Sequence, residues 1–159
     1  MAILMISGSR KTTENILQYT YDVVDRSIAN GFDIVVGDAM GVDSAVVWRC
    51  LEKEYDEFTV YGTKTTPRNE APTTNYKLFQ AIEGQGDGRN YTDRDRFMVD
   101  MADRVMCIWN GESKGTIAVA EYARKSNKQF WLFGLYGDSP KVVDLTSRLD
   151  EILEWMATK

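Results

Sequence analysis

The chain has 159 residues, of which 43% are hydrophobic and 27% charged, as in a single domain with an ordinary hydrophobic core. Its formal net charge of −5 argues against a general nucleic-acid binder, which needs clustered Lys and Arg, but it is compatible with one small phosphorylated ligand. The absence of histidine removes the commonest metal ligand and general base, so we expect no metal site.

The distribution of apolar residues predicts a cytoplasmic protein. No apolar run approaches the roughly 18 residues of a membrane span, so we expect no membrane partner. The apolar segment 1–7 is too short for a signal peptide and has no basic region before it, which favours a first strand. Cys50 and Cys107 fall inside a predicted helix and a predicted strand, so buried free thiols are expected.

Strands alternate with helices in the first half of the chain. An apolar run at 2–6 ends in a small-residue turn, and an amphipathic helix then runs to about Ala29. A second buried strand at 32–36 leads into a glycine-containing turn and a helix that ends near Glu54. A third strand is predicted at 58–61.

The segment 63–90 has no clear periodicity. Thr, Pro, Asn and Gly dominate it, and only one short helix is expected, near 75–82. Loops of this length are usually functional or mobile, so we interpret 63–90 as a lid or specificity loop.

The stretch 91–123 predicts a short helix, a buried strand at 104–108, a turn at 110–115 and a helix that begins at Thr116. A fifth strand is expected at 128–133. The tail, 145–157, should form an amphipathic helix whose apolar face docks on the domain, the alternative being a partner site.

This alternation predicts an α/β fold, a Rossmann-like three-layer sandwich with a mostly parallel five-stranded sheet in the order 3-2-1-4-5. We expect one domain over 1–159. Ligands in such folds bind beyond the carboxyl ends of the strands, near the point where the strand order reverses. The turns at 7–10, 37–43 and 110–116, which we call the first, second and third turns, should converge there.

The first turn contains Gly8, Ser9 and Arg10. The glycine lets the backbone approach a ligand closely, while the hydroxyl and the guanidinium can bind a phosphate. The alternative is a plain strand-to-helix turn with an exposed arginine.

The second turn contains Gly37, Asp38, Gly41 and Asp43. It differs from the dinucleotide-binding Gly-x-Gly-x-x-Gly pattern and lacks the lysine of a P-loop. Its glycines still permit a tight turn before a helix, and both aspartates could accept hydrogen bonds from a ribose. For Asp43 the alternative is a helix cap.

The third turn and the residue before it supply Trp109, Gly111, Ser113, Lys114, Gly115 and Thr116. Backbone N–H groups, hydroxyls and an ammonium at the positive end of a helix suit a phosphate or another anion. Trp109, at the end of the strand, could stack on a base or pack under the turn.

Three charged residues are candidates for catalysis. Arg94 is expected near the start of its helix, pointing into the cleft while Met98 packs in the core. Glu112 and Glu121 are carboxylates that could stabilise an oxocarbenium-like centre or activate water. Solvation of Glu112, and pairing of Glu121 with a basic residue of its own helix, are the alternatives.

The segments GSR, GDAMGVD and RDRFMVDMADRVMCIWNGESKGT together resemble the SLOG superfamily, which contains LOG phosphoribohydrolases, DprA/Smf proteins and YpsA-like small proteins. The closest likeness is to stand-alone YpsA-like and related phage or bacterial proteins, and it covers about 3–133. The resemblance implies a nucleotide-type ligand, and related proteins often pair as homodimers.

In LOG enzymes the matching region reads Arg-Lys-x-x-Met and then Pro-Gly-Gly-x-Gly-Thr-x-x-Glu, and its Arg and Glu serve catalysis. Arg94 and Met98 match that Arg and Met, whereas Asp95 stands at the position of the Lys and Val119 at that of the Glu. The loss of this carboxylate argues against LOG-type hydrolysis.

We therefore expect a protein that binds a nucleotide or a nucleotide-derived small molecule as a sensor, carrier or sequestering protein. The alternative is an N-glycosidic hydrolase or transferase acting on nucleoside monophosphates, with Ser9, Arg10 and Thr116 on the phosphate. We expect no cofactor, and a DprA-like nucleic-acid role is the least favoured reading because of the net charge of −5.

Overall fold

The computed structural model describes residues 1–69, 73–79 and 87–159, with the backbone alone at 87–90. The elements in chain order are β1 (Ile3–Gly8), α1 (Glu14–Ala29), β2 (Asp33–Gly37), α2 (Val42–Glu52), β3 (Phe58–Gly62), β4 (Tyr76–Leu78), α3 (Asp87–Met101), β5 (Arg104–Trp109), α4 (Lys114–Lys125), β6 (Gln129–Gly134), β7 (Val143–Asp144), the 3-10 turn η1 (Thr146–Arg148) and α5 (Leu149–Ala157). Within these described ranges, no helix combines the length and the apolarity needed to cross a membrane.

The strands form one sheet in the order β4-β3-β2-β1-β5-β6-β7. Every neighbouring pair is parallel except β6 and β7. The predicted α/β class and the mostly parallel Rossmann-like sheet are confirmed, and the five predicted strands stand in the predicted order. The sheet has seven strands rather than five because β4 and β7, of three and two residues, extend its two edges.

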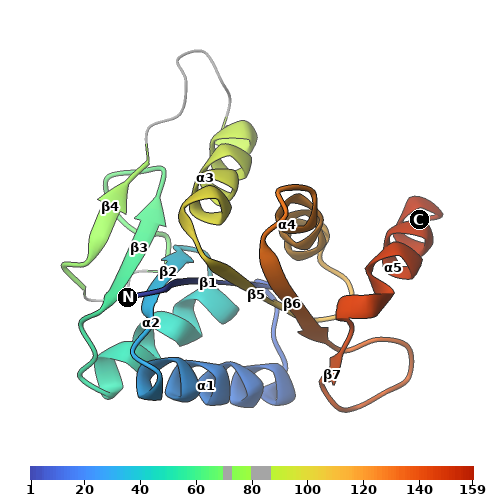
Figure 1. Ribbon diagram of the computed structural model, residues 1–159, viewed down its shortest axis with the longest axis horizontal. Coiled ribbons are helices and arrows are strands. Elements are labelled where there is room, and N and C mark those ends of the chain that lie inside the picture. The colour runs from blue at the N-terminus through green and yellow to red at the C-terminus, as the bar shows by residue number, and fades with distance from the viewer. Residues whose placement is uncertain (70–72, 80–86) are drawn as a thin grey trace.

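Helices cover both faces of the sheet (Figure 1). Helices α1 and α2 pack on one face, and α3 and α4 pack on the other, with α5 beside α4. Side chains alternate along β1, so Leu4 and Ile6 join the cluster under α1 and α2 while Met5 joins the one under α3 and α4. This burial on both faces explains why the central strands read as continuous apolar runs.

The segment predicted as a lid, 63–90, contains regular structure. Residues 76–78 form β4, parallel to β3, where part of a short helix was predicted, and α3 already begins at Asp87. Strand β4 forms because β3 offers an open edge, from which the N–H of Val60 donates to the carbonyl of Asn75 at 2.8 Å. The last part of the helix predicted near 75–82, residues 80–82, lies outside the described residues.

The last part of the chain also differs in detail from the prediction. Helix α4 begins at Lys114, two residues before the predicted start at Thr116, with Ser113 as its N-cap residue. The tail consists of η1 followed by α5, whose Leu149 and Ile152 are buried in the cluster under α4. The tail helix is therefore docked on the sheet through its apolar face.

Candidate functional site

A cavity of about 440 Å³ lies at the carboxyl ends of β1, β2 and β5. We call it the central cavity. It brings together residues of all three turns and of α3, as expected where the strand order reverses. Of the predicted site residues, those that line it are Gly8, Ser9, Arg10, Gly37, Asp43, Arg94, Ser113, Lys114, Gly115 and Thr116.

The first two turns interlock through glycine. Gly41 has a φ of +77°, and a Cβ atom there would lie 2.2 Å from the carbonyl oxygen of Arg10. The N–H of Val42 donates to the carbonyl of Ser9 at 3.1 Å, which holds the two turns in contact. Only glycine permits both this backbone conformation and this close approach.

Hydroxyl groups connect the first turn to the start of α4. Ser9 Oγ lies 2.8 Å from Ser113 Oγ, and Ser113 Oγ donates to Thr116 Oγ1 at 2.9 Å. The N–H of Asn110 donates to Ser9 Oγ at 3.0 Å. Because the Ser113 side chain makes no capping hydrogen bond to its own helix, the first N–H groups of α4 are left to an anion or to water.

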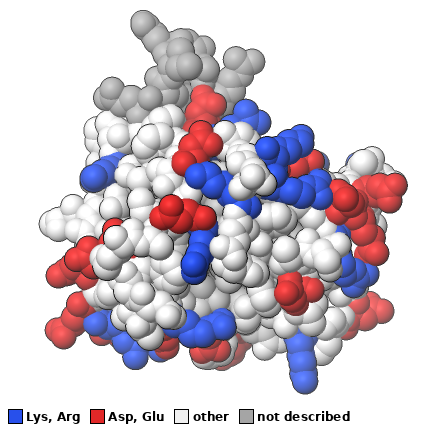
Figure 2. Space-filling model, in the orientation of Figure 1, with Lys and Arg blue, Asp and Glu red and all other residues white. Residues whose placement is uncertain are grey.

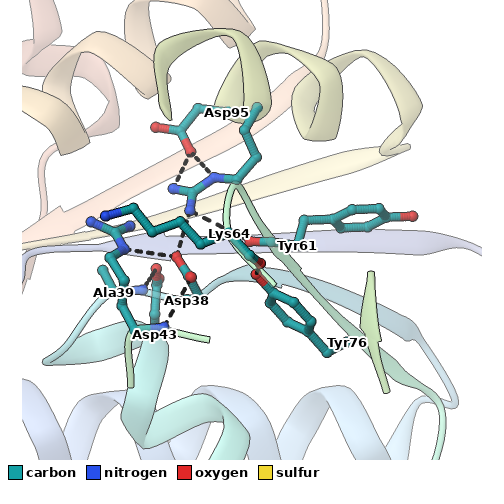
Figure 3. Close-up of polar contacts among 9 residues, drawn as sticks. Asp38, Ala39, Asp43, Tyr61, Lys64, Tyr76 and Asp95 are labelled. Carbon is teal, nitrogen blue, oxygen red and sulfur yellow. Dashed lines mark hydrogen bonds and ion pairs between the residues drawn. The ribbon is translucent and has the colours of Figure 1, made fainter. Parts of the chain in front are cut away.

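Arg94 is held in a buried network instead of reaching freely into the cleft. Asp38 and Asp95, the two carboxylates that hold it, are labelled in Figure 3. Its Nη1 donates to Asp38 at 2.9 Å and its Nη2 donates to Asp95 at 2.8 Å. Asp38 also accepts from the side chain and the backbone N–H of Arg68, at 2.9 and 3.0 Å. Asp38, which is fully buried, thus holds two arginines at the cavity and is not presented to a ribose.

Asp43 is a buried carboxyl in the cavity wall and is 5% exposed. Its Oδ2 accepts from the N–H of Ala39 at 3.1 Å, while the N-cap position of α2 belongs to Gly41, so Asp43 does not act as the helix cap. Burial raises the pKa of Asp43 to about 7, and the nearby guanidinium of Arg94 opposes that rise. This carboxyl therefore changes its charge near neutral pH.

Trp109 and Gly111 do not face the central cavity. Trp109 is fully buried, its Nε1 donates to the carbonyl of Ser113 at 2.9 Å, and it packs against Tyr136 and Trp155. Of the two predicted readings, packing under the turn is the one observed, because α5 closes over the indole. Gly111, with a φ of +92°, turns the chain against the backbone of Leu135.

The two glutamates considered for catalysis also lie away from the central cavity. Glu112 is exposed on the third turn and lines a different cavity. Glu121 lies two turns along α4, where its carboxylate is 3.7 Å from the ammonium of Lys125. The carboxyls that line the central cavity are Asp43 and Asp95. In the described part of the chain, no three His, Cys, Asp or Glu side chains are grouped to hold a metal ion.

Sequence reasoning missed several lining residues, among them Arg68, Tyr91 and Asp95. Arg68 lies in the segment without periodicity, and its guanidinium carbon sits 3.8 Å from the centroid of the Tyr91 ring. No local signal marks Arg68, because only folding brings it to Asp38. Asp95 stands within the Arg-Asp-Arg motif, which did point to this part of α3.

Positive charge is gathered locally despite the net charge of −5. Among the described residues, four cationic side chains line the central cavity (Arg10, Arg68, Arg94 and Lys114) against the carboxyls of Asp43 and Asp95. Arg10 and Lys114 are exposed, and neither forms an ion pair with a described residue. On the face drawn in Figure 2, Lys and Arg side chains lie close together beside α3 and α4, with Asp and Glu side chains among them.

A family model described as DNA recombination-mediator protein A matches residues 1–144. Protein Smf of Synechocystis sp. is 24% identical over 135 residues, covering 77% of this chain and 33% of its own length. This chain thus spans about a third of that curated relative.

Two solved structures show the same fold. The DNA processing protein A of Helicobacter pylori, studied for its single-stranded DNA binding mode, has a TM-score of 0.67 at 22% identity, covering 99% of this chain and 79% of that one. The molybdenum cofactor binding protein of Rippkaea orientalis has a TM-score of 0.63 at 18% identity, covering 96% and 83%. At these identities the likeness establishes the fold alone.

These comparisons correct two expectations. The first is the expected function, binding of a nucleotide-like small molecule or its alternative, nucleotide chemistry, which the match to a DNA-handling family overturns. The second is the expectation that nucleic acid is an unlikely partner, which the same match overturns. The error came from using the net charge of the whole chain, since DNA responds to local charge.

The SLOG-type resemblance is confirmed for the fold and for its DprA/Smf members, while the finer likeness to YpsA-like proteins stays a prediction. Because the family model spans 144 of the 159 residues, the chain belongs to the DNA recombination-mediator protein A family.

Proposed function

We propose that this chain binds single-stranded DNA, with a backbone phosphate in the central cavity between the first turn and the start of α4. The observation that carries the proposal is that Arg10 and Lys114, neither of which is ion-paired with a described residue, lie beside the open N–H groups of α4 in a chain of a DNA-handling family. A helix N-terminus flanked by two cations is suited to a phosphate group.

The surrounding network supports the same role. Arg68 and Arg94 are held in place by Asp38 and Asp95, so their guanidinium groups are already positioned at the cavity before a ligand arrives. A preorganised site loses less conformational entropy on binding than one that must be assembled. The interlocked glycine turns bring the backbone N–H groups within reach of a phosphate.

Single-stranded DNA binding is the one activity that we assign to this chain. The curated relative is about three times as long as the region matched here, so the proposal concerns this region and not the whole of that protein's activity. The homodimer that the resemblance implies stays a prediction, and light scattering on the same samples measures it.

The test is fluorescence anisotropy with a labelled oligothymidylate, titrated with protein at several salt concentrations. We expect binding that weakens as salt rises, since bound cations are released from the strand. For single strands each phosphate contact contributes about 0.7 to the salt slope, which corresponds to about 5-fold in affinity near 0.1 M salt. Arg10→Ala and Lys114→Ala should each show such a loss, and the double variant should lose about 25-fold.

Lys53→Ala is the matched control, because Lys53 is an exposed lysine at the far end of α2 from the cavity. It removes the same charge as Lys114→Ala without touching the proposed site. Absence of salt-dependent binding by the wild-type protein would refute the proposal. Equal losses in the Lys53 and Lys114 variants would show that only net charge matters and would refute the proposed site.

A further inference from the structure

A second and larger cavity, of about 840 Å³, lies next to the central one. It is formed by the third turn, the segment that follows β6, and α5. We call it the aromatic groove. Lys114 lines both cavities, so the two meet at the start of α4. A ligand that leaves the central cavity past Lys114 enters this groove.

The groove is built around three aromatic rings. Tyr136 and Trp155 are half-buried and line the groove, while Trp109 is fully buried and packs against both of these rings. The three ring centroids are mutually 6.1, 6.4 and 6.2 Å apart, and Trp155 stands edge-on to the other two. This contact fixes the orientation of Tyr136 and Trp155, since neither ring can turn without displacing its neighbour.

Cationic side chains lie over the two half-buried rings. The guanidinium carbon of Arg148 is 4.7 Å from the centroid of Tyr136, and the ammonium of Lys159 is 4.5 Å from that of Trp155. Arg148 is partly neutralised by Glu151, at 2.5 Å, whereas Lys159 forms no ion pair within the described residues. Glu112, Asp138 and Glu151 also line the groove, so its cations are balanced by carboxylates and its rings are the main feature suited to a single strand, whose bases stack on aromatic side chains.

We infer that the aromatic groove binds nucleobases of the same single strand whose phosphate lies in the central cavity. This inference rests on the proposed function. Tyr136 and Trp155 supply the stacking surfaces, and Lys114 holds the backbone where the strand passes from one cavity to the other. Because the bases of a duplex are already stacked and paired, the groove favours single strands over duplexes.

One wall of the groove comes from a segment that the family match does not include. The family model ends at residue 144, whereas Arg148, Trp155 and Lys159 come from the tail that follows. The tail helix is held in place independently of any ligand, because its Leu149 and Ile152 are buried in the core. The groove is therefore formed before DNA arrives.

The experiment compares a normal oligothymidylate of about 16 nucleotides with an abasic strand of the same length, which has the phosphates without the bases. We expect Tyr136→Ala to lower the affinity for the normal strand about 10-fold and to leave the affinity for the abasic strand unchanged. Tyr136→Phe, which keeps the ring, should restore binding. Tyr21→Ala, which removes a partly buried tyrosine of α1, is the matched control and should bind both strands like the wild type.

A second readout identifies the ring involved. Oligothymidylate should quench part of the tryptophan fluorescence, and that part should be missing in Trp155→Phe, while the abasic strand quenches neither protein. Circular dichroism and thermal unfolding confirm that each variant is folded.

The outcomes separate the inference from the proposed function. Wild-type protein that binds neither strand would overturn both. Wild-type protein that binds both strands with equal affinity, or a Tyr136→Ala variant that loses affinity for both equally, would leave the phosphate site standing and overturn the base-binding groove.

Discussion

Replacing Asp43 by asparagine should stabilise the protein at alkaline pH and have little effect at acidic pH. Asp43 is 5% exposed and accepts a single hydrogen bond within the described residues, from the N–H of Ala39. Burial disfavours its charged form more than the neighbouring guanidinium of Arg94 favours it, so its pKa rises to about 7. Asparagine has nearly the same shape, keeps a carbonyl oxygen for Ala39 and carries no charge.

The size of the effect follows from proton linkage. The pKa of Asp43 rises from 3.8 to about 7 on folding, and each pKa unit corresponds to about 1.4 kcal/mol, which gives about 4 kcal/mol. Between these two values the folded state keeps the proton that the unfolded state releases. The stabilisation of the wild type is therefore complete below about pH 4 and is lost as pH rises through about 7.

The assay is urea unfolding followed by circular dichroism at a series of pH values from about 4 to about 8. The difference in unfolding free energy between Asp43→Asn and the wild type should grow by up to about 4 kcal/mol across this range, in favour of the variant. Asp56→Asn, at an exposed aspartate, is the control and should give a constant difference. Parallel curves for Asp43→Asn and the wild type would refute the reasoning.

Three further predictions concern the same region. Gly41→Ala should lower the free energy of unfolding in urea by at least about 2 kcal/mol, because the alanine must adopt a φ of +77° and its Cβ would collide with the carbonyl of Arg10. Gly137→Ala, where φ is also positive but the surrounding space is open, should lower it by less. Arg94→Gln should cost up to about 3–5 kcal/mol, because it removes a buried charge partner from both Asp38, which keeps Arg68, and Asp95. Arg49→Gln, in a partly exposed pair, should cost about 1 kcal/mol or less, and equal costs would contradict the buried network. The affinity for single-stranded DNA should fall as pH rises through about 7, because Asp43 then becomes negatively charged. If the affinity of the Asp43→Asn variant falls over the same pH range, the effect belongs to another titrating group.

Local patterns in the sequence were sufficient for the centre of the fold and for the position of the cavity. Apolar runs bounded by glycine identify β1, β2, β3, β5 and β6, and the handedness of the crossovers then leaves few strand orders. The three turns follow β1, β2 and β5, whose carboxyl ends are neighbours in any such sheet. Their convergence was therefore predictable without knowing a single side-chain contact.

The edges of the sheet were not predictable in this way. Strands β4 and β7 have three and two residues, too few for a periodicity to be read, and each forms only because a longer neighbour offers an unpaired edge. The helix expected near 75–82 was wrong over 76–78 for this reason. Pairing with β3 outweighed the weak local preference.

The sequence by itself thus determined the sheet, the strand order and the meeting of three turns, because these depend on short-range patterns and on chain handedness. Tertiary structure alone decided which charges line the cavity. It brought Arg68 and Asp95 in, left Glu112 and Glu121 out and buried Trp109 beneath α5. It also concentrated cations at one site of a chain whose total charge is −5, since a sum over residues carries no information on where they lie.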